Sequence, residues 1–374
     1  MTSKDNRPGP SRVGDLLRLI PRGGPAICNI SITNACNATC GFCNFAHDKG
    51  FVTHRSWLDA DRLPAALALL KERASVRFVT FMGGEPLLHP RIGEMAQAVT
   101  DAGMQPTLVT NGWLLPKTLD GLARAGITTL FVSIDAADAA THERNRGLKG
   151  VCDRIREANA RMPSLGISPV ASVTMSRLIP DYGALVDFLK ELGFAAVTFS
   201  YPRKAPLGSS SLVWSEDSDL VDLPPRELLA AFDAVDALRD RFPVHNPRAS
   251  VADMKRRLRG EPERFVCLAG YKYFYLDWNY DLWRCEDWDA PLCSVWDFDA
   301  SRMIRDGCQA CTTDCYRDAS VMLHMAVALG DAFARLSEGK LAAAAQAIAN
   351  RRTADSLGAV LRQGNRLGRL SGIG

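Results

Sequence analysis

The sequence predicts an α/β fold: a parallel sheet curled into a partial (β/α)6 TIM-like barrel, followed by a small cysteine-rich C-terminal domain and terminal helices. One observation is that short apolar runs rich in Val, Ile, Thr and Phe alternate with longer amphipathic stretches between about residues 26 and 201. Strands that are covered by helices on both faces have this composition. The other is that the eleven cysteines are clumped, three of them within residues 36–43 and six within 267–315.

Six apolar runs are the predicted strands, and a helical pattern follows each of them. Gly103, Gly126 and Gly193 stand where three of the helices should stop. Because crossovers between parallel strands are right-handed, the repeats predict a curled sheet whose chemistry lies at the carboxyl ends of the strands. The predicted strands are 27–33, 76–82, 106–110, 127–134, 167–174 and 195–200, and the predicted helices are 56–74, 89–102, 114–125, 150–162, 181–192 and 224–241.

The remaining segments differ in composition from the barrel repeats. A stretch with Pro, Gly and consecutive serines at 202–222 is predicted to be a loop, and prolines at 243 and 247 mark a boundary. The last segment is rich in Ala, Leu and Arg and reads as helices with a solvated basic face, the alternative being a surface for an anionic partner. The predicted divisions are an N-terminal extension (1–25), the barrel (26–243), the cysteine-rich domain (244–318) and a C-terminal helical extension (319–374).

Charge and hydrophobicity exclude several classes of protein. The formal net charge of the 374 residues is only +3, so no global bias points to nucleic acid or to a membrane surface. No signal peptide is evident at the start of the sequence, and no apolar run approaches the ~18 residues of a membrane span. An odd cysteine count without an export signal argues against a disulfide framework. We therefore expect a cytoplasmic protein with no transmembrane segment.

The first cysteine group is a C-x3-C-x2-C motif in the loop after the first predicted strand. Its members are Cys36, Cys40 and Cys43. Three thiolates can hold three irons of a [4Fe–4S] cube and leave the fourth iron open for a small molecule. Zinc is the alternative, with His47 as the fourth ligand of a structural site.

Polar motifs end the next three predicted strands. Gly83-Gly84-Glu85-Pro86 ends the second strand, where adjacent glycines allow a close backbone approach and a carboxylate can meet an ammonium group. Thr110-Asn111-Gly112 ends the third strand and Ser133-Ile134-Asp135 ends the fourth. All three motifs fall at the mouth of the predicted barrel, although each alone is also compatible with an ordinary turn or cap.

In combination and in this order, the motifs resemble those of radical S-adenosylmethionine (radical SAM) enzymes. The family signature C-x3-C-x-aromatic-C is met by Cys36, Cys40, Phe42 and Cys43, and Gly83 to Pro86 match the GGEP motif. The run from His142 to Gly147 resembles a segment that follows the fourth strand in this family, and a structural helix-start reading of it is equally good. The resemblance covers roughly residues 26–201.

The resemblance implies two cofactors and a reaction. A [4Fe–4S] cluster would bind S-adenosylmethionine through its open iron, and one electron would break the sulfonium C–S bond to give a 5′-deoxyadenosyl radical. That radical would abstract hydrogen from the substrate in a site that orients it and excludes water. The implied cluster ligands are Cys36, Cys40 and Cys43, and the implied residues of the S-adenosylmethionine site are Phe42, Gly83, Gly84, Glu85, Pro86, Asn111, Ser133 and Asp135.

The second cysteine group begins with two pairs, C-x17-C and C-x2-C, around an aromatic segment that could form a hairpin turning at 277–281. Zinc is again the alternative, because C-x2-C pairs are common zinc ligands. The pattern resembles the auxiliary-cluster domains called SPASM and Twitch, with Tyr280 standing where SPASM domains have a glycine. The one-cluster Twitch arrangement implies an auxiliary [4Fe–4S] cluster; Cys293 or Cys315 might replace one of its four assigned ligands, which are Cys267, Cys285, Cys308 and Cys311.

These motifs predict a radical SAM oxidoreductase that acts on a small-molecule substrate, by dehydrogenation or rearrangement of a sugar- or cyclitol-like alcohol. One alternative is a maturase of a ribosomal peptide, and another, of a different class, is a zinc-stabilised binding protein without catalysis. A flavodoxin or ferredoxin is the expected electron donor. The sequence assigns no catalytic acid or base, and it predicts Cys28 and Cys152 to be small buried hydrophobic residues.

Overall fold

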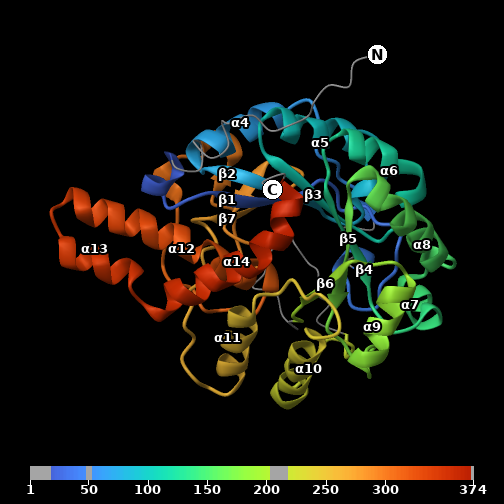
Figure 1. Ribbon diagram of the computed structural model, residues 1–374. Coiled ribbons are helices and arrows are strands. Elements are labelled where there is room, and N and C mark those ends of the chain that lie inside the picture. Colours follow the sequence, from blue (N-terminus) through green and yellow to red (C-terminus); the bar gives the residue numbers. More distant parts are fainter. Residues whose placement is uncertain (1–17, 48–52, 203–217, 372–374) are drawn as a thin grey trace.

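The computed structural model of the chain describes residues 18–47, 53–202 and 218–371. Most of the predicted N-terminal extension and most of the predicted loop at 202–222 therefore lie outside the described residues. Figure 1 shows a curved sheet with helices packed around its outer face and a helical C-terminal region beside it. This arrangement is the α/β partial barrel that the sequence predicts.

Six parallel strands form the barrel, and each agrees with a predicted strand to within two residues at either end. They follow one another in space as in sequence, because each pairs in parallel with the next. Most apolar side chains of the strands are buried, as expected for a sheet that helices cover, and Phe78 is an exposed exception. The strands are β1 (Ala26–Ser31), β2 (Val76–Met82), β3 (Gln105–Thr110), β4 (Thr129–Ile134), β5 (Ser168–Thr174) and β6 (Ala196–Ser200).

The helices between the strands lie on the outside of the sheet (Figure 1). Gly103, Gly126 and Gly193 follow three of them with positive φ, which confirms the predicted helix stops. The first helix begins at residue 63 and not at 56, because Pro64 occupies its first turn and Trp57 makes a β-bridge to Thr33. The helices are α4 (Leu63–Arg73), α5 (Ile92–Asp101), α6 (Leu115–Arg124), α8 (Val151–Arg161), α9 (Tyr182–Glu191) and α10 (Pro225–Leu238).

Shorter helices complete this part of the chain. Two were not predicted as separate helices, α7 (Ala139–Arg146) and α11 (Arg248–Leu258). Asp138 caps α7, since its side chain accepts a hydrogen bond of 2.8 Å from the backbone N–H of Thr141. The remaining short elements are α2 (Asn44–His47) and the 3₁₀ helices η1 (Ile20–Arg22), η2 (Pro86–Leu88), η3 (Met162–Leu165), η4 (Val295–Asp297) and η5 (Ala300–Arg302).

The cysteine-rich region continues the barrel sheet. β7 (Tyr273–Leu276) pairs in parallel with β1, and β8 (Asp281–Trp283) and β9 (Cys293–Ser294) extend the same sheet in antiparallel fashion. At the other edge, the Asn246 side chain bonds both backbone groups of Phe199, donating to its carbonyl at 2.8 Å and accepting from its N–H at 2.7 Å. Segments on the C-terminal side of the predicted boundary at 243 thus attach to both ends of the six-stranded sheet.

The β7–β8 hairpin confirms the predicted turn at 277–281 and contains an unusual residue. Tyr280 has a φ of 68°, a left-handed conformation that glycine adopts readily and a bulky side chain rarely does. Its ring packs against Trp296 at a centroid distance of 5.3 Å, and its hydroxyl donates to the carbonyl of Asp59. The sequence resemblance expects a glycine at this position, and the packing contacts hold a tyrosine there in a conformation that glycine adopts readily.

The C-terminal helices are α12 (Asp314–Ser337), α13 (Leu341–Ile348) and α14 (Arg351–Ser371). α12 and α13 form a projecting hairpin (Figure 1). α14 packs on α12, where the Ser356 hydroxyl donates to the carbonyl of Val321 at 2.6 Å. By length and composition α12 is apolar enough to cross a membrane, the one such helix among the described residues, and 39% of that stretch is buried inside the protein. It begins at residue 314 and not at the predicted 319, which brings its first turns to the barrel.

Candidate radical SAM site and auxiliary cysteine site

A cavity of about 330 Å³ opens at the carboxyl ends of the barrel strands. Four strands each contribute two side chains that are two positions apart, because alternate residues of a strand point to the same face. The cysteine loop after β1 and the first turns of α12 contribute further walls. The strand residues that line the cavity in this way are Thr80 and Met82, Phe131 and Ser133, Ser172 and Thr174, and Thr198 and Ser200.

The three cysteines of the C-x3-C-x2-C motif all line this cavity, as does Phe42. Burial raises the pKa of Cys36 to about 12, and burial also raises the pKa values of Cys40 and Cys43. The positive charge of Arg146 opposes this rise at all three thiols. His47, the alternative zinc ligand, donates from Nε2 to the carbonyl of Cys40 at 2.8 Å.

Gly83 and Gly84 lie directly against the chain that leads into the cysteine loop. A Cβ on Gly83 would lie 2.2 Å from the carbonyl oxygen of Thr33, and a Cβ on Gly84 would lie 2.2 Å from that of Ala35. The backbone N–H groups of Gly84 and Glu85 donate to these two carbonyls at 2.8 Å. The glycines therefore permit the close approach of one protein segment to another, in addition to lining the cavity.

Glu85 is buried and joins the ends of β2 and β3. Its carboxylate accepts hydrogen bonds from the Thr110 hydroxyl (2.7 Å), the Asn111 N–H (2.7 Å) and the Leu87 N–H (3.0 Å). Burial raises the pKa of Glu85 above its usual value, even though these donors oppose the rise. Because a carboxylate has about four acceptor positions, roughly one remains for a ligand. Asn111 also lines the cavity, whereas Pro86 is buried beside it at the start of η2.

Asp135 lies behind the cavity wall and positions a residue that lines it. The Arg146 Nη2 donates to Asp135 Oδ1 at 2.6 Å, and the Asn145 Nδ2 donates to Asp135 Oδ2 at 2.9 Å. Asp135 is fully buried, while Arg146 and Ser133 reach the cavity. Any influence of Asp135 on a ligand in this cavity is thus exerted through Arg146, a role that the spacing of the strand-end motif does not reveal.

The run from His142 to Gly147 also holds the cysteine loop. The Thr39 N–H donates to the carbonyl of Arg146 at 2.9 Å, and the Gly41 N–H donates to Asn145 Oδ1 at 3.2 Å. Gly147 has a φ of 64°, and a Cβ there would lie 2.3 Å from the Thr39 hydroxyl. The segment forms the second half of α7 and its stop at Gly147, and not the helix start that the structural reading expects, and it also fixes the loop that carries the three cysteines.

Four of the C-terminal cysteines gather at a second place, beside β7 and the start of α12. They are the four that the sequence assigns, Cys267, Cys285, Cys308 and Cys311. The Cys267 N–H donates to the carbonyl of Cys308 at 3.2 Å. Burial raises the pKa of Cys267 to about 11 and raises those of Cys285 and Cys311, and the Cys311 charge adds to the rise at Cys267 and Cys285.

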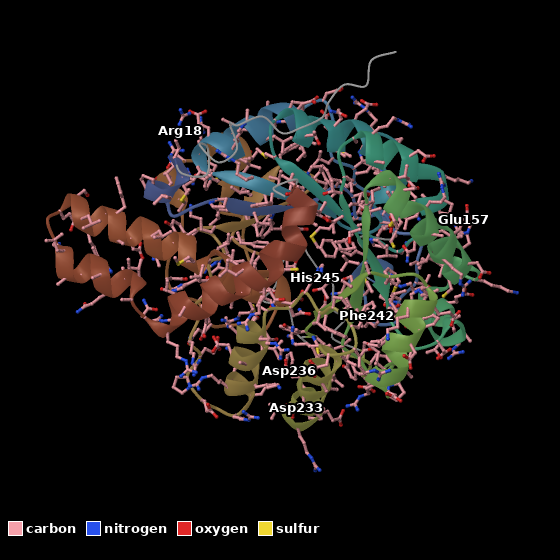
Figure 2. All side chains as sticks on the ribbon, viewed as in Figure 1. Arg18, Glu157, Asp233, Asp236, Phe242 and His245 are labelled. Carbon is pink, nitrogen blue, oxygen red and sulfur yellow. The ribbon has the colours of Figure 1, made fainter. Side chains whose placement is uncertain are left out.

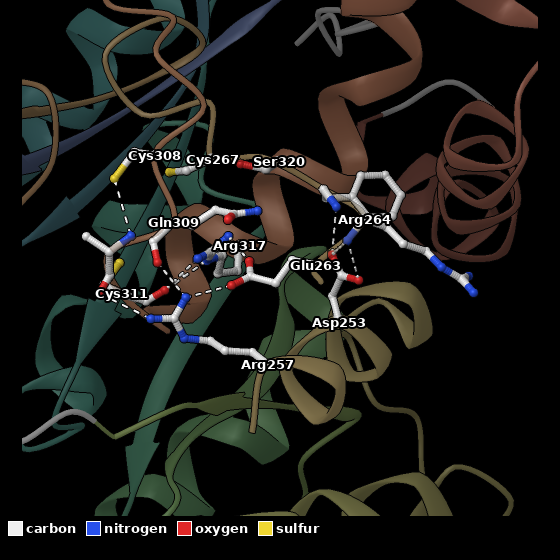
Figure 3. Close-up of polar contacts among 12 residues, drawn as sticks. Asp253, Arg257, Glu263, Arg264, Cys267, Cys308, Gln309, Cys311, Arg317 and Ser320 are labelled. Carbon is white, nitrogen blue, oxygen red and sulfur yellow. Dashed lines mark hydrogen bonds and ion pairs between the residues drawn. The ribbon is translucent and has the colours of Figure 1, made fainter. Parts of the chain in front are cut away.

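Two arginines fix the loop that carries Cys308 and Cys311 (Figure 3). Arg317 donates to the carbonyl of Cys311 from Nε at 3.0 Å and from Nη2 at 2.7 Å. Arg257 donates to the backbone carbonyls of Gln309 and Ala310. Both guanidinium groups form ion pairs of 2.6 Å with Glu263, which is itself buried. The hydrogen bonds hold the loop against α11 and α12, and the two ion pairs hold both arginines to the segment after α11.

Of the other cysteines, Cys315 packs against the apolar cluster that contains Cys267 and Cys285. Cys315 lines the barrel cavity, and its thiol accepts a hydrogen bond from Tyr273. Cys293 lies in β9, and Cys28 and Cys152 are buried as predicted. None of the cysteines is disulfide-bonded. In the described parts of the chain, no three His, Cys, Asp or Glu side chains are close enough to hold a single metal ion.

Several polar residues of the cavity were not identified from the sequence. They are Asn29 in the middle of β1, Glu286 after β8, and Asp314 and Asp318 on α12. The helical pattern of the C-terminal segment extends back to residue 314, and a helix predicted to start there would have indicated the last two. Nothing in the local pattern distinguishes Asn29 from other polar residues of a strand.

Comparisons with known proteins agree with this geometry. Residues 30–198 match the family model of the Radical SAM superfamily. The AdoMet-dependent heme synthase of Methanosarcina barkeri is 35% identical over 176 residues, which are 46% of this chain and 49% of that protein. The GTP 3′,8-cyclase of Listeria welshimeri is 26% identical over 234 residues, covering 59% of this chain and 67% of that one. The chain thus spans about half the length of the first relative.

Solved structures extend the likeness of fold beyond the barrel. Streptococcus suis SuiB bound to its precursor peptide SuiA superposes with a TM-score of 0.52 and 18% identity, over 87% of this chain and 81% of that one. At this level of identity the likeness concerns the fold alone. The three motif cysteines and most residues of the six barrel strands fall within the matched segment. We conclude that residues 30–198 form a domain of the radical SAM superfamily.

Proposed function

We propose that this chain is an enzyme that cleaves S-adenosylmethionine reductively and abstracts hydrogen from a substrate. The observation that carries the proposal is that the three motif cysteines and the Gly83–Glu85 wall face one cavity at the strand ends. The radical SAM family uses a [4Fe–4S] cluster and S-adenosylmethionine. When bound, the cluster supplies the electron that breaks the sulfonium C–S bond and so generates the 5′-deoxyadenosyl radical.

The residues present fit the cluster. Cys36, Cys40 and Cys43 supply three thiolates on a short loop, which matches a cube that keeps one iron open. The Ala38 N–H lies 3.4 Å from Cys36 Sγ and donates to it, and such hydrogen bonds to sulfur tune a cluster. Arg146 provides positive charge beside the thiols. Burial of the site excludes water from a reactive intermediate.

Residues at the strand ends would hold S-adenosylmethionine. Gly83 and Gly84 present backbone to the cavity, and Glu85 has an acceptor position for an ammonium group. Asn111, Ser133 and Phe42 line the same cavity and are available to the rest of the molecule. Asp135 acts here as a positioning residue, because it orients Arg146 and does not itself reach the cavity.

The second cysteine group would hold one auxiliary [4Fe–4S] cluster. Its four thiols can occupy all four irons, so this cluster would transfer electrons and would not bind S-adenosylmethionine. The Ala269 N–H donates to Cys267 Sγ at 3.4 Å, and the Ala310 N–H donates to Cys308 Sγ at 3.5 Å. The charges of Arg284 and Arg317 act on thiols of this group. Residues 244–318 thus supply an auxiliary unit whose strands extend the barrel sheet.

For the substrate we propose a small molecule that is oxidised or rearranged, with a flavodoxin or ferredoxin of the cytoplasm as the electron donor. The first turns of α12 close the cavity on one side, which favours a compact substrate. A ribosomal peptide is the second candidate, because the similar fold of SuiB accommodates a precursor peptide. A zinc-stabilised binding protein without catalysis is the third candidate. Metal analysis distinguishes it from both enzymes, because it would contain zinc and no iron.

The experiment that tests the proposal uses the full chain, purified and reconstituted without oxygen. Iron and sulfide content and the release of 5′-deoxyadenosine after reduction with dithionite are measured for wild type and Cys36→Ala. Wild type should contain iron and release 5′-deoxyadenosine, and the variant should release none. Cys293→Ala is the matched control, since its thiol lies in neither cysteine group. Zinc without iron in wild type, or undiminished release by Cys36→Ala, would refute the proposal.

A further inference from the structure

The first turns of α12 form one wall of the cavity. This part of the helix connects the β6 side of the barrel sheet to the β7 side. On the β6 side, Asp318 accepts hydrogen bonds from the Tyr201 hydroxyl (3.2 Å) and the Asn246 amide (2.7 Å). On the β7 side, the Tyr316 ring packs on Tyr273 at a centroid distance of 4.7 Å. The start of α12 is therefore held on both sides, and its side chains face the cavity in fixed positions.

This wall is strongly acidic. Asp314, Asp318 and Glu286 all line the cavity, and Asp314 and Glu286 are buried. Among the described residues that line the cavity, Arg146 is the one arginine or lysine. Its guanidinium group is bonded to Asp135 at 2.6 Å. Asp314 and Asp318 therefore face the cavity with no arginine or lysine other than Arg146 among the described residues that line it.

Burial shifts the pKa values of the two carboxyl groups on α12. Burial raises the pKa of Asp314 to about 8, and the charge of Asp318 adds to the rise. Burial also raises the pKa of Asp318 to about 7, although Asn246 and Tyr201 donate hydrogen bonds to it and the Arg239 charge opposes the rise. The two residues are four positions apart and so lie on one face of the helix. A positive charge between them would remove their repulsion.

Asn29 supplies an independent indication of a ligand. It lies in the middle of β1, is 2% exposed and lines the same cavity. Its amide N–H donates to the phenol oxygen of Tyr273, but its Oδ1 has no hydrogen-bond donor among the described residues. A buried acceptor without a donor is destabilising, so such a position is normally satisfied by ordered water or by a bound group. Tyr273 also donates to Cys315, which places Asn29 beside the start of α12.

These observations point to the same kind of ligand. An amide oxygen and ionised carboxylates accept hydrogen bonds and do not donate them, and a bound positive charge favours the ionised form of Asp314 and Asp318 over the protonated form that burial favours. The group that satisfies them should therefore donate several hydrogen bonds and carry positive charge. No three of the described acidic, histidine or cysteine side chains are spaced to hold a single metal ion. We propose that the substrate carries an alkylammonium or guanidinium group, which Asp314, Asp318 and the Oδ1 of Asn29 bind. This inference rests on the proposed function and narrows its substrate to cationic molecules.

The test measures binding to the reconstituted full chain by calorimetry, with S-adenosylmethionine present at saturation. The small probes are n-butylguanidinium and n-butylammonium, compared with neutral n-butylurea and n-butanol. The peptide probe is acetyl-Gly-Arg-Gly-amide, compared with the same peptide containing neutral citrulline. We expect at least one cationic probe to bind about tenfold or more tightly than its neutral partner. Binding of the butyl probe alone identifies a small-molecule source, and binding of the arginine peptide alone identifies a peptide source.

Substitutions of the two aspartates of α12 test whether the cation binds at the acidic wall. Asp314→Asn and Asp318→Asn should each weaken binding of the cation about tenfold or more, and Asp318→Glu should restore most of it. Glu157→Gln is the matched control, because Glu157 lies on the exposed outer face of α8 (Figure 2) and its loss changes the net charge equally. The wild-type comparison of cationic with neutral probes remains decisive if a variant does not fold.

Three outcomes would overturn the inference: equal binding of cationic and neutral probes, undiminished binding by both asparagine variants, or loss of cation binding when S-adenosylmethionine is added. The last would mean that the carboxylates serve the cofactor. Release of 5′-deoxyadenosine by wild type, measured without any probe, tests the proposed function separately. Release without selective cation binding would reject this inference and leave the proposed function in place.

Discussion

Arg146 and Asp135 form a buried ion pair, with 2.6 Å between Nη2 and Oδ1, directly behind the wall of the cavity. Burial raises the pKa of Asp135, but the charge of Arg146 and the hydrogen bonds from Arg146 and Asn145 hold the pKa below its usual value. The same arginine carries the carbonyl that accepts a hydrogen bond from Thr39 in the cysteine loop. The pair therefore connects the end of β4 to the loop on which the first cluster would be built.

Asp135→Asn should destabilise the protein by about 3–5 kcal/mol, because it leaves the buried Arg146 charge without its partner. Urea unfolding monitored by circular dichroism measures the loss. Asp153→Asn removes an exposed partner of Arg156, with a side chain that is 83% exposed, and should cost less than about 1 kcal/mol. Since the pKa of Asp135 is lowered, the difference should persist above about pH 4 and shrink as the pH falls further. Equal effects of the two substitutions would contradict this role.

His142 should make the stability of the protein depend on pH on the acidic side of neutrality. Burial lowers the pKa of His142 from 6.5 to about 4, so the folded protein holds it neutral while the unfolded chain protonates it near pH 6.5. The stability that neutral His142 contributes to the folded protein is complete above pH 6.5. It is lost as the pH falls toward 4, which lowers the free energy of unfolding by an amount on the order of 3 kcal/mol.

The measurement compares the free energy of unfolding of wild type and His142→Gln between pH 7.5 and 4.5. The difference between the two proteins isolates the histidine from the other acidic groups. Wild type should lose more stability than the variant over this range. Parallel pH profiles would show that His142 does not titrate between the folded and unfolded states as proposed.

The strands could be predicted closely from sequence because each is an uninterrupted apolar run between helical repeats. β2 matches its predicted bounds in full, and the other strands differ by one or two residues at an end. α4 was less predictable, since the apolar pattern at 56–62 belongs to a segment that bridges Thr33 and not to a helix. Local patterns do not record such a long-range pairing.

Long-range contacts also limit what the sequence can predict about the functional residues. The motif glycines were expected to admit a ligand, and the structure adds that they admit the chain leading into the cysteine loop, which lies about 50 residues away in sequence. The four assigned cysteines lie close together, as their spacing suggested, whereas the position of Cys315 on the wall of the barrel cavity depends on the direction in which α12 begins. Asn29 and the acidic residues of α12 meet only because the helix crosses from one end of the sheet to the other.

Gly84→Ala should disrupt the first cysteine site specifically. The added Cβ would lie 2.2 Å from the backbone carbonyl of Ala35, so the chain before Cys36 must move, at a cost of about 1–3 kcal/mol. Iron content and 5′-deoxyadenosine release should both fall. Gly93→Ala is the matched control, because a Cβ added there would have no atom within 4 Å and alanine favours helix α5 by about 1 kcal/mol. Full iron content in Gly84→Ala would show that the close approach is not required.

Cys308→Ala should remove one cluster and spare the other. Two [4Fe–4S] clusters correspond to about eight irons per chain, so the variant should retain about four. Release of 5′-deoxyadenosine should continue, because Cys36, Cys40 and Cys43 lie in the barrel cavity and not in the auxiliary group. Cys315→Ala provides the discriminating comparison: its thiol faces that cavity, so the variant should keep about eight irons. If Cys315→Ala instead lost half of its iron and Cys308→Ala lost none, the ligand assignment would have to be exchanged, because only a ligated thiol affects the iron content in this way.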